Sequence, residues 1–464
     1  MRISVVGCGY LGAVHAAALA ELGHHVVGLD TDAALVAALE EARPPFYEPG
    51  FDDLLHRARD RGRLRFTTDP AALAGARVHF VCVGTPEGDG GAADLRYVDA
   101  ALAELAPSLR PGDLVVGKST VPVGTARGLA GLVPASVGLA WNPEFLREGH
   151  AVADTLRPDR LVYGAEGPRA AEAVGMLDDV YRPLLAAGVP RLVVDLPTAE
   201  LAKVAANAFL ATKVSFANAM AEVCAAAGGD AVALTRILGR DPRIGPAHLG
   251  AGLGFGGSCL PKDVRAFAVR AEELGAPGAA ALLHDVDALN DQALARVAAL
   301  VEAGLAGASG RRVAVLGAAF KPDSDDVRCS PALALAGTLR DGGADVVVTD
   351  PRALDRARAA APGLACATTV DETVRGADVV VLATEWDEYR ALDPARLGRL
   401  AARRVLVDAR HAVDADGWRD AGWRVLAPGR TEPRRPGAGA TRPRGVGGQK
   451  TGLPPVTPRT VPDT

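Results

Sequence analysis

The sequence predicts an α/β protein in which two Rossmann-like, doubly wound regions are joined by a long central helix and a helical middle region. Three observations support this fold class. Short β-branched runs alternate with Ala/Leu-rich stretches over residues 1–195, residues 196–305 read as almost entirely helical, and the alternation returns over residues 306–430. Such alternation is typical of βαβ units, which build a parallel sheet with helices on both faces.

The first region contains short runs that read as buried strands. They are rich in Val, Ile and Leu, and the stretches between them have helical spacing. The runs are Ile3–Val6, Val26–Asp30, Val78–Val83 and Leu114–Val116. We therefore expect residues 1–195 to form one doubly wound domain with a parallel sheet.

The middle region, residues 196–305, is expected to begin with an unusually long helix. Residues Thr198–Ala227 contain neither Gly nor Pro, and Gly228 and Gly229 supply a stop signal. This length corresponds to roughly 45 Å of helix at 1.5 Å per residue. A helix so long and so rich in alanine must bury more than one side. We expect it to join the two outer regions and to contribute to the interface of a homodimer or a higher homo-oligomer.

The third region, residues 306–430, is expected to form a second, smaller doubly wound domain. Its strand-like runs are Arg312–Gly317, Asp345–Asp350 and Ala377–Leu382. Beyond it, Pro, Gly, Arg and Thr dominate residues 431–464. Such a composition cannot bury enough apolar surface to fold alone, so we expect this tail to be disordered.

Composition excludes several classes of function. The net charge of −5 argues against a nucleic-acid-binding protein, which needs a basic surface. The cysteines are widely scattered without a CxxC pair or a histidine at metal spacing, which excludes a disulfide framework and a metal site. No apolar run is long enough to span a bilayer, and the first residues read as a strand and not as a signal peptide. We expect a cytoplasmic protein that binds neither membranes nor nucleic acids.

A dinucleotide-binding motif follows the first predicted strand. Gly7, Gly9 and Gly12 form a GxGxxG that opens a helix, an arrangement in which the backbone turns tightly and approaches a pyrophosphate at the helix N-terminus. Asp30 closes the second predicted strand. A carboxylate at that position accepts hydrogen bonds from ribose hydroxyls and repels a 2′-phosphate, so NAD is favoured over NADP.

Polar clusters in three further parts of the chain are more than a fold requires. Lys118–Thr125 and Trp141–Gly149 come just after predicted strands, where doubly wound sheets place their ligands. Lys203 and Asn207 stand four residues apart on the long helix and project from one face. The third cluster is the glycine-rich segment Gly254–Asp263, which contains Cys259 and Lys262.

Together these segments resemble the UDP-glucose/GDP-mannose dehydrogenase family. The similarity covers residues 1–430 in order and includes the GxGxxG turn. Its other motifs are Phe46–Gly50, Val83–Pro86, Asn142–Gly149, Glu200–Asn207, Gly254–Asp263 and Lys321–Pro331. The resemblance implies an NAD-dependent enzyme that oxidises the primary alcohol of UDP-glucose to the carboxylate of UDP-glucuronate in two steps.

The resemblance also implies how the reaction proceeds. Two hydrides must leave one carbon, and a thiol makes the second removal possible by forming a thiohemiacetal that is oxidised to a thioester. Cys259 matches the family's nucleophile. We expect Lys262 to favour its thiolate, and Gly256 and Gly257 to leave room for the sugar.

The other matching residues take roles from the same resemblance. Besides Cys259, Lys203 and Asn207 are expected to stabilise the oxyanion by donating hydrogen bonds. Asp263 and Thr120 are expected to hold or activate a water molecule, and Glu144 to act as the base for thioester hydrolysis. Those expected at the cofactor are Gly7, Gly9, Gly12, Asp30, Thr85, Thr120, Glu148, Lys262 and Arg328. Those expected at the substrate are Glu144, Phe145, Leu146, Lys203, Asn207, Phe255, Gly256, Gly257 and Lys321, with Arg243 reaching it from the partner subunit.

Several alternatives stay open or are disfavoured at this point. Within the family the same chemistry could act on GDP-mannose or an N-acetylated UDP-hexosamine. A sugar-nucleotide epimerase would need a Tyr-xxx-Lys pair, and no tyrosine here has a lysine four residues later. A single-step hydroxyacid dehydrogenase would explain Lys203 and Asn207 but would leave Cys259 and the third region without a role. A nucleotide-sugar sensor would not need the full catalytic set.

Overall fold

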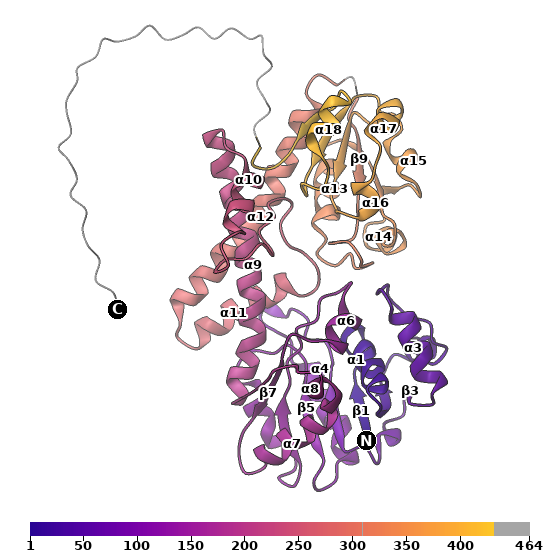
Figure 1. The fold of residues 1–464 in the computed structure, drawn as a ribbon, viewed down its shortest axis with the longest axis vertical. Coiled ribbons are helices and arrows are strands. Elements are labelled where there is room, and N and C mark those ends of the chain that lie inside the picture. The colour runs from indigo at the N-terminus through magenta and orange to yellow at the C-terminus, as the bar shows by residue number, and fades with distance from the viewer. Residues whose placement is uncertain (309, 431–464) are drawn as a thin grey trace, which may run out of the picture. The chain divides into compact units, whose positions relative to one another are not determined.

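The computed structural model describes residues 1–308 and 310–430, and the predicted tail lies outside this part of the chain. In the described part the strands form two sheets, and helices fill the stretch between them (Figure 1). The predicted fold class is confirmed. Among the described residues, no helix is long and apolar enough to cross a membrane, and no group of His, Cys, Asp and Glu side chains could hold a metal ion.

The first sheet has the strand order β3-β2-β1-β4-β5-β6-β7-β8. Its strands are β1 (Arg2–Val6), β2 (His25–Leu29), β3 (Leu64–Thr67), β4 (Val78–Val81), β5 (Leu114–Gly117), β6 (Gly138–Trp141), β7 (Leu161–Ala165) and β8 (Arg191–Val194). The helices that follow them are α1 (Tyr10–Glu21), α2 (Ala33–Glu40), α3 (Phe51–Asp60), α4 (Arg96–Leu105), α5 (Thr125–Leu129), α6 (Ala151–Leu156), α7 (Ala170–Val180) and α8 (Arg182–Ala186). Short 3₁₀ turns are η1 (Pro70–Leu73), η2 (Asp89–Gly91), η3 (Ala106–Ser108) and η4 (Ala130–Leu132).

The expectation of a fully parallel first sheet is wrong at one strand pair. All neighbouring pairs from β3 to β6 in this order are parallel, and so are β7 and β8, but β7 runs antiparallel to β6. The segment between β6 and β7 holds a loop and the short helix α6, which packs on α1. Two antiparallel strands can be joined without a helical crossover on one face of the sheet. The segment between β6 and β7 can therefore place polar residues beside the end of β6.

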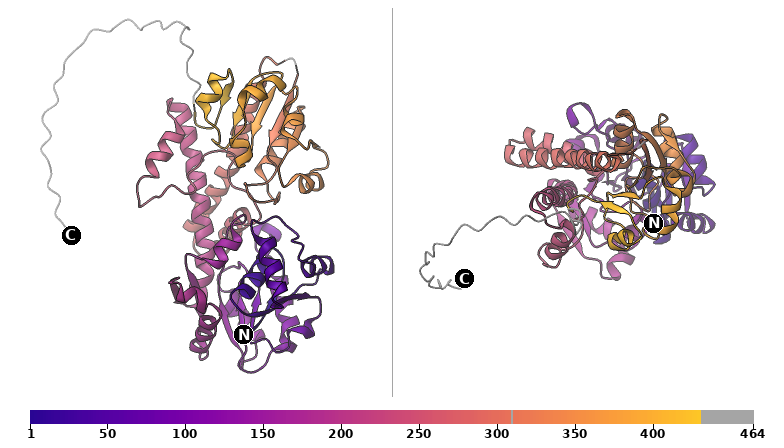
Figure 2. Two further views of the ribbon diagram at one scale, coloured as in Figure 1. Left: turned by 45° about the vertical axis from the view of Figure 1, so that its right-hand side comes forward. Right: turned by 90° about the horizontal axis from the view of Figure 1, so that it is seen from above.

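The middle region contains two long helices, one more than the sequence predicted. They are α9 (Leu196–Ala227) and α12 (Pro277–Leu305), with α10 (Ala231–Leu238) and α11 (Leu260–Glu273) between them in the chain. The first turns of α9 pack on β6 and β7, and its later turns pack on α11 and α12 (Figures 1 and 2). The last turns of α12 pack on the second sheet, so the two helices together connect both sheets.

The second sheet is parallel, with the order β11-β10-β9-β12-β13-β14. Its strands are β9 (Arg312–Leu316), β10 (Asp345–Thr349), β11 (Ala365–Cys366), β12 (Val379–Leu382), β13 (Val405–Asp408) and β14 (Arg424–Leu426). Its helices are α13 (Pro331–Asp341), α14 (Leu354–Ala360), α15 (Val370–Val374), α16 (Asp387–Arg390), α17 (Pro394–Leu400) and α18 (Ala415–Asp420).

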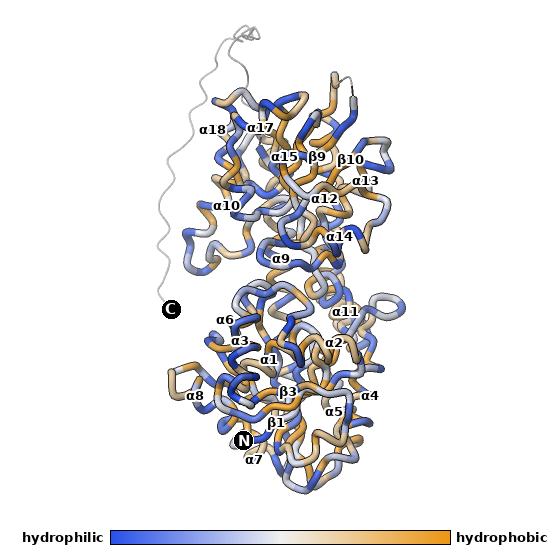
Figure 3. The backbone as a smooth tube through the Cα atoms, turned by 90° about the vertical axis from the view of Figure 1, so that its right-hand side faces the viewer, coloured by the Kyte–Doolittle hydropathy of each residue, from blue (hydrophilic) through white to orange (hydrophobic). Residues whose placement is uncertain are grey.

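Alternation along the strands explains the two-sided covering of the first sheet. In β1, Ile3 and Val5 belong to an apolar cluster with α1, α3 and α7, whereas Val6 belongs to a second cluster with α4, α5 and the start of α9. The inner strands of both sheets are coloured as hydrophobic in Figure 3. Because the strands themselves are apolar, the polar side chains of the candidate site lie in the loops beyond the carboxyl ends of the strands.

Candidate active site

The glycine-rich turn after β1 is shaped for close approach of a ligand. Gly7 has φ of +88°, and a Cβ atom there would lie 2.8 Å from Val83. A Cβ atom at Gly12 would lie 1.8 Å from the carbonyl oxygen of Gly7, whereas the space beside Gly9 is open. Because α1 begins at Tyr10, this open side lies at the positive end of a helix. The turn therefore fits a pyrophosphate.

Asp30 fixes this turn and presents a carboxylate beside it. Its two oxygens accept hydrogen bonds from the backbone N–H groups of Cys8, at 2.7 Å, and Asp32, at 3.0 Å. The equivalent carboxylate of the second sheet, Asp350, accepts from the N–H groups of Ala318 and Ala319 and from the Trp386 indole, and it is buried. Asp30 remains partly open to a ribose, and Asp350 does not.

Buried polar side chains on α9 and α11 form the centre of the site. Lys203 and Asn207 are both buried on one face of α9. The Nζ of Lys203 lies 2.8 Å from Oε1 of Glu144, and Nδ2 of Asn207 donates to Oδ2 of Asp263 at 2.7 Å. Burial lowers the pKa of Lys203, but Glu144, Cys259 and Asp263 together outweigh it and raise the pKa. Lys203 is therefore an ammonium group at neutral pH.

Cys259 stands at the N-terminus of α11, where water reaches its side chain. The thiol nevertheless lies deep among protein groups. Desolvation and the nearby Asp263 raise its pKa, Lys203 lowers it, and Glu148 and Glu144 raise it further, so the pKa is raised overall. In the absence of ligands the sulfur is therefore a thiol at neutral pH.

The expectation that Lys262 favours the thiolate is wrong. Its Nζ lies 2.5 Å from Oδ1 of Asp263 and 3.5 Å from Oγ1 of Thr85. Lys203, on another helix, is the cation that lowers the pKa of Cys259. Lys262 follows Cys259 by three residues, and its long side chain turns toward the adjacent carboxylate instead of the sulfur.

The expectation that Gly256 and Gly257 leave room for a sugar is also wrong, because other parts of the chain fill the space beside both glycines. A Cβ atom at Gly256 would lie 2.3 Å from the carbonyl oxygen of Cys329 and 2.5 Å from the ring of Pro331. A Cβ atom at Gly257, where φ is +83°, would lie 2.7 Å from the ring of Phe320. These glycines let the segment between β9 and α13 approach the Cys259 loop.

Glu148 is the point where three parts of the chain meet. Its Oε1 accepts from Oγ of Ser258 and its Oε2 from Oγ of Ser324, each at 3.3 Å. Nη2 of Arg328 lies 3.9 Å from Oε1, and Arg328 also pairs with Asp326. Burial, followed by the charge of Asp326, raises the pKa of Glu148 to about 7. The sequence did not identify Ser258, Ser324 or Asp326, because their neighbours come from distant segments.

Lys321 belongs to the same segment between β9 and α13. Its Nζ lies 5.3 Å from the centre of the Phe320 ring. Burial lowers the pKa of Lys321, although the negative charges of Glu148, Cys259 and Glu48 oppose the shift. Phe255, in the loop before Cys259, is buried, and its N–H donates to Oδ1 of Asn290.

The loop that carries Glu144, Phe145, Leu146 and Glu148 is fixed at both ends. At its start, the N–H of Leu146 donates to Oε2 of Glu144 at 2.7 Å, and the Phe145 ring lies under Arg160. At its end, the buried Glu48 accepts from the N–H groups of Gly149 and Ala151, and the hydroxyl of Tyr10 donates to the same carboxylate. Glu48 and Tyr10 stood inside motifs of the sequence, but no local pattern indicated that they pair.

Lys118 contacts Asn142, just before the same loop. Its buried Nζ donates to Oδ1 of Asn142 at 3.1 Å, and Nδ2 of Asn142 donates to the carbonyl of Val162 on β7. Burial lowers the pKa of Lys118 to about 8, against the charges of Cys82 and Glu144. The sequence marked the Lys118 segment as polar and did not predict this role.

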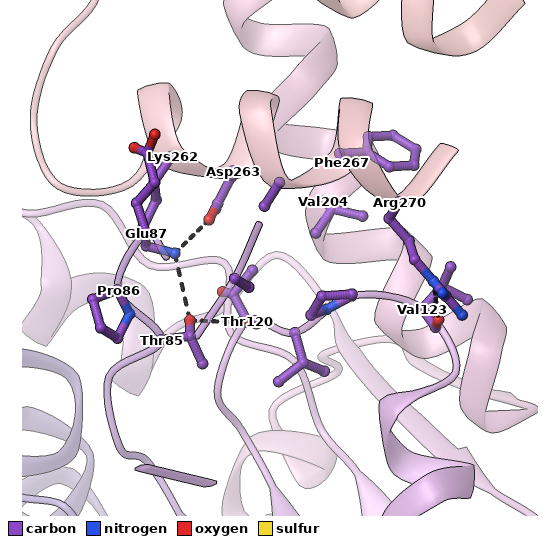
Figure 4. A pocket seen from close by; sticks show the side chains of 14 residues that line it. Thr85, Pro86, Glu87, Thr120, Val123, Val204, Lys262, Asp263, Phe267 and Arg270 are labelled. Atoms are coloured by element: carbon purple, nitrogen blue, oxygen red, sulfur yellow. Dashed lines mark hydrogen bonds and ion pairs between the residues drawn. The ribbon is translucent and has the colours of Figure 1, made fainter. Parts of the chain in front are cut away.

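A pocket lies between α11 and two loops of the first sheet (Figure 4). At one end Thr85, Thr120, Lys262 and Asp263 point toward one another, and Oγ1 of Thr85 donates to the carbonyl of Thr120 at 2.7 Å. The other end is mostly apolar and is closed by Arg270. Val123, Val204 and Phe267 lie at that end (Figure 4). The pocket thus brings together three of the residues predicted at the cofactor.

Arg243 lies on the surface of the chain, away from the other residues predicted at the substrate. Its guanidinium pairs with Asp241 and is 87% exposed. Its neighbour Ile244 is held by Lys213 of α9, through a hydrogen bond of 3.0 Å to the Ile244 carbonyl. Lys213 follows Lys203 by ten residues, roughly 15 Å along the helix axis. Within one chain, Arg243 therefore does not reach the cluster of polar side chains around Lys203.

Comparison with known proteins agrees over nearly the whole described chain. Models of the UDP-glucose/GDP-mannose dehydrogenase family match as its NAD binding domain over residues 1–185, its central domain over 197–292 and its UDP binding domain over 314–415. The UDP-glucose 6-dehydrogenase of Rhizobium meliloti is 41% identical over 442 residues, which is 93% of this chain and 100% of the relative. That of Pseudomonas aeruginosa is 41% identical over 428 residues, covering 89% and 93%.

Solved structures agree with these relatives. A UDP-glucose dehydrogenase from Pyrobaculum islandicum is 40% identical with a TM-score of 0.84, covering 93% of this chain and 98% of that one. A UDP-D-ManNAc dehydrogenase from Pyrococcus horikoshii is 27% identical with a TM-score of 0.80, covering 93% and 99%. The glycine turn, Asp30 and these matches agree on NAD as the cofactor. This chain belongs to the UDP-glucose/GDP-mannose dehydrogenase family.

Proposed function

We propose that this enzyme oxidises UDP-glucose to UDP-glucuronate in two steps, through a thiohemiacetal and a thioester on Cys259. The observation that carries the proposal is the position of the Cys259 thiol near the buried Lys203 and Asp263 and the half-buried Glu144. A fold alone would not require a cation and two carboxylates around a thiol. The names of the relatives at 40–41% identity favour UDP-glucose as the sugar nucleotide.

The chain's own residues would hold the cofactor along the edge of the first sheet. Gly7, Gly9 and Gly12 take the pyrophosphate, and Asp30 takes a ribose. Thr85, Thr120, Lys262, Glu148 and Arg328 complete the proposed cofactor set. When bound, NAD would supply the hydride acceptor for the substrate carbon. The polar end of the pocket in Figure 4, at Asp263, is lined by Thr85, Thr120 and Lys262 of this proposed set.

Lys203 and Asn207 stabilise the negative oxygen that develops at the reacting carbon. Lys203 stays charged because Glu144, Cys259 and Asp263 surround it, and it is held at a fixed position on α9. Preorganised donors of this kind act more strongly in a buried site than in water. Asn207 is oriented by Asp263, which with Thr120 would also hold a water.

Cys259 attacks the aldehyde that the first step produces, and the second step leaves a thioester. Glu144 then removes a proton from the water that hydrolyses it. Its Oε2 is oriented by the N–H of Leu146, and its Oε1 by Lys203. Glu144 is therefore held by its own loop and by α9.

The third region, residues 306–430, would bind the uridine diphosphate, and the first, residues 1–195, NAD. Phe145, Leu146, Phe255, Gly256, Gly257 and Lys321 complete the proposed substrate set. We place the enzyme in the cytoplasm as a homodimer through the middle region, residues 196–305. Exposed apolar side chains on α9 support this surface, and they are Phe209, Phe216 and Val223. Arg243, exposed near the same helix, would then serve the partner's site.

The deciding experiment is to count NADH released per nucleotide sugar consumed. With UDP-glucose we expect about two NADH per sugar, because an alcohol loses two hydrides on the way to an acid. GDP-mannose and an N-acetylated UDP-hexosamine are tested beside it. Efficient turnover of either one in preference to UDP-glucose would overturn the substrate assignment. About one NADH per sugar would overturn the two-step reaction.

Coenzyme choice tests the role of Asp30. We expect kcat/KM to be at least about a hundredfold higher with NAD than with NADP, because the Asp30 carboxylate repels a 2′-phosphate. Asp30→Asn keeps an oxygen that can accept from the N–H of Cys8 and removes the charge. Its preference should fall by about tenfold or more. Equal use of both coenzymes by the parent would contradict the assignment.

A further inference from the structure

A chain of hydrogen-bonding groups links the Cys259 sulfur to a buried carboxylate. Oγ of Ser258 lies 3.6 Å from Sγ of Cys259 and 3.3 Å from Oε1 of Glu148. An ionised carboxylate only accepts, so the serine hydroxyl donates to Glu148 and its lone pairs face the thiol. The thiol is the remaining donor of the chain.

We propose that Glu148 takes the proton of Cys259 through the hydroxyl of Ser258, and so produces the nucleophilic thiolate. The proposal rests on the function proposed above, in which Cys259 attacks an aldehyde. It gives Ser258 a role in proton transfer, and it gives Glu148 a second role beside the cofactor.

The transfer is balanced within three side chains. The S–H bond of Cys259 breaks, the sulfur keeps the electron pair, and the proton passes to Oγ of Ser258. The hydroxyl gives its own proton to Oε1 of Glu148, so Ser258 ends as a neutral hydroxyl. The result is a thiolate, beside which the ammonium of Lys203 lies, and a neutral carboxylic acid.

The electrostatics of the cluster show why a local base is needed and why Glu148 can serve. Burial and Asp263 raise the pKa of the Cys259 thiol, so few thiolates form by loss of a proton to water. Burial and Asp326 raise the pKa of Glu148 to about 7, against Arg328 and Lys321. A base with a pKa near neutral accepts a proton better than an ordinary carboxylate.

The surroundings leave one oxygen of Glu148 for this purpose. Ser324 donates to Oε2, so Oε1 faces Ser258 and, at 3.9 Å, Arg328. The other titratable groups around Glu148 are Asp326, Lys321 and the hydroxyl of Tyr10, and the pKa of Tyr10 is raised chiefly by burial. Ser324 and Arg328 come from the segment between β9 and α13, so contact with the third region orients the base.

The test is the rate at which iodoacetamide alkylates Cys259, measured between about pH 6 and pH 10 without NAD or sugar. Mass spectrometry of the peptide that carries Cys259 reports this site alone. In the parent we expect two rises in rate. The first, near pH 7, marks deprotonation of Glu148, and the second, at higher pH, marks deprotonation of the thiol itself.

Two variants separate a relay from a purely electrostatic effect. Ser258→Ala keeps the charge of Glu148 and breaks the chain, and Glu148→Gln removes the base and the charge. The relay predicts that Ser258→Ala loses most of the first rise and reacts about tenfold more slowly near pH 7.5, because the hydroxyl that donates to the thiolate after the transfer is gone. Glu148→Gln should show a single rise, because the base that titrates near pH 7 is absent. If Glu148 acted only through its charge, Ser258→Ala would react like the parent, and that result would overturn the proposal.

Three controls belong to the same experiment. Ser258→Thr keeps the hydroxyl and should keep both rises, and so should Ser324→Ala, since Ser324 donates to the other oxygen of Glu148. Alkylation of Cys329, which is also exposed, should be the same in all variants. The assay uses no substrate, so it can succeed even if UDP-glucose proves to be the wrong sugar nucleotide, and the two proposals fail independently.

Discussion

Replacing Cys259 with serine is expected to lower steady-state turnover at least about a thousandfold, while the variant still binds NAD and UDP-glucose. A serine hydroxyl forms its anion far less readily than a thiol near neutral pH, and an ester hydrolyses more slowly than a thioester. The first hydride removal does not need the sulfur. A rapid-mixing experiment should therefore show about one NADH per active site, followed by a stall.

Cys329→Ser is the matched control, because Cys329 is also exposed and carries no role in the proposed mechanism. It should turn over at the parental rate. Melting temperatures of the two variants, compared with the parent, separate loss of chemistry from loss of fold. Near-parental turnover by Cys259→Ser, with about two NADH per sugar, would show that no covalent thioester is needed.

Replacing Lys203 with methionine is expected to slow both hydride removals, including the first, which Cys259→Ser leaves intact. Removing a preorganised donor from an oxyanion site costs about a hundred- to a thousandfold in kcat, or about 3–4 kcal/mol. Methionine keeps most of the side-chain volume and removes the ammonium. The measurement is the rate of the first NADH formed after rapid mixing, for this variant and for Cys259→Ser.

Lys203→Met should also unfold at a lower temperature, because it leaves the carboxylate of Glu144, whose side chain is only 11% exposed, without its partner at 2.8 Å. Breaking a buried ion pair from one side costs about 3–5 kcal/mol of stability. Adding Glu144→Gln removes that unpaired charge, so the double variant should regain most of the lost melting temperature and none of the lost activity. Recovery of activity together with stability would mean that Lys203 acts on the fold and not on the oxyanion.

The sequence by itself determined the fold class and the parts of the site that depend on local spacing. The strand runs at Ile3–Val6 and Arg312–Gly317, the helix from Thr198 to Ala227 and the GxGxxG turn each follow from patterns within a few neighbouring residues. Lys203 and Asn207, four residues apart, share a face of any helix. Such features survive wherever the segment packs, so one chain without an alignment is enough to predict them.

Only the tertiary structure decided which groups meet across segments. It set Lys203 and not Lys262 beside Cys259, filled the space next to Gly256 with the backbone of Cys329, and surrounded Glu148 with serines from two other regions. A helix turns about 100° per residue, so one residue decides which neighbour a side chain faces. Which long-range contacts form depends on how both sheets and the helices between them pack. That packing is a property of the whole chain, and local spacing does not encode it.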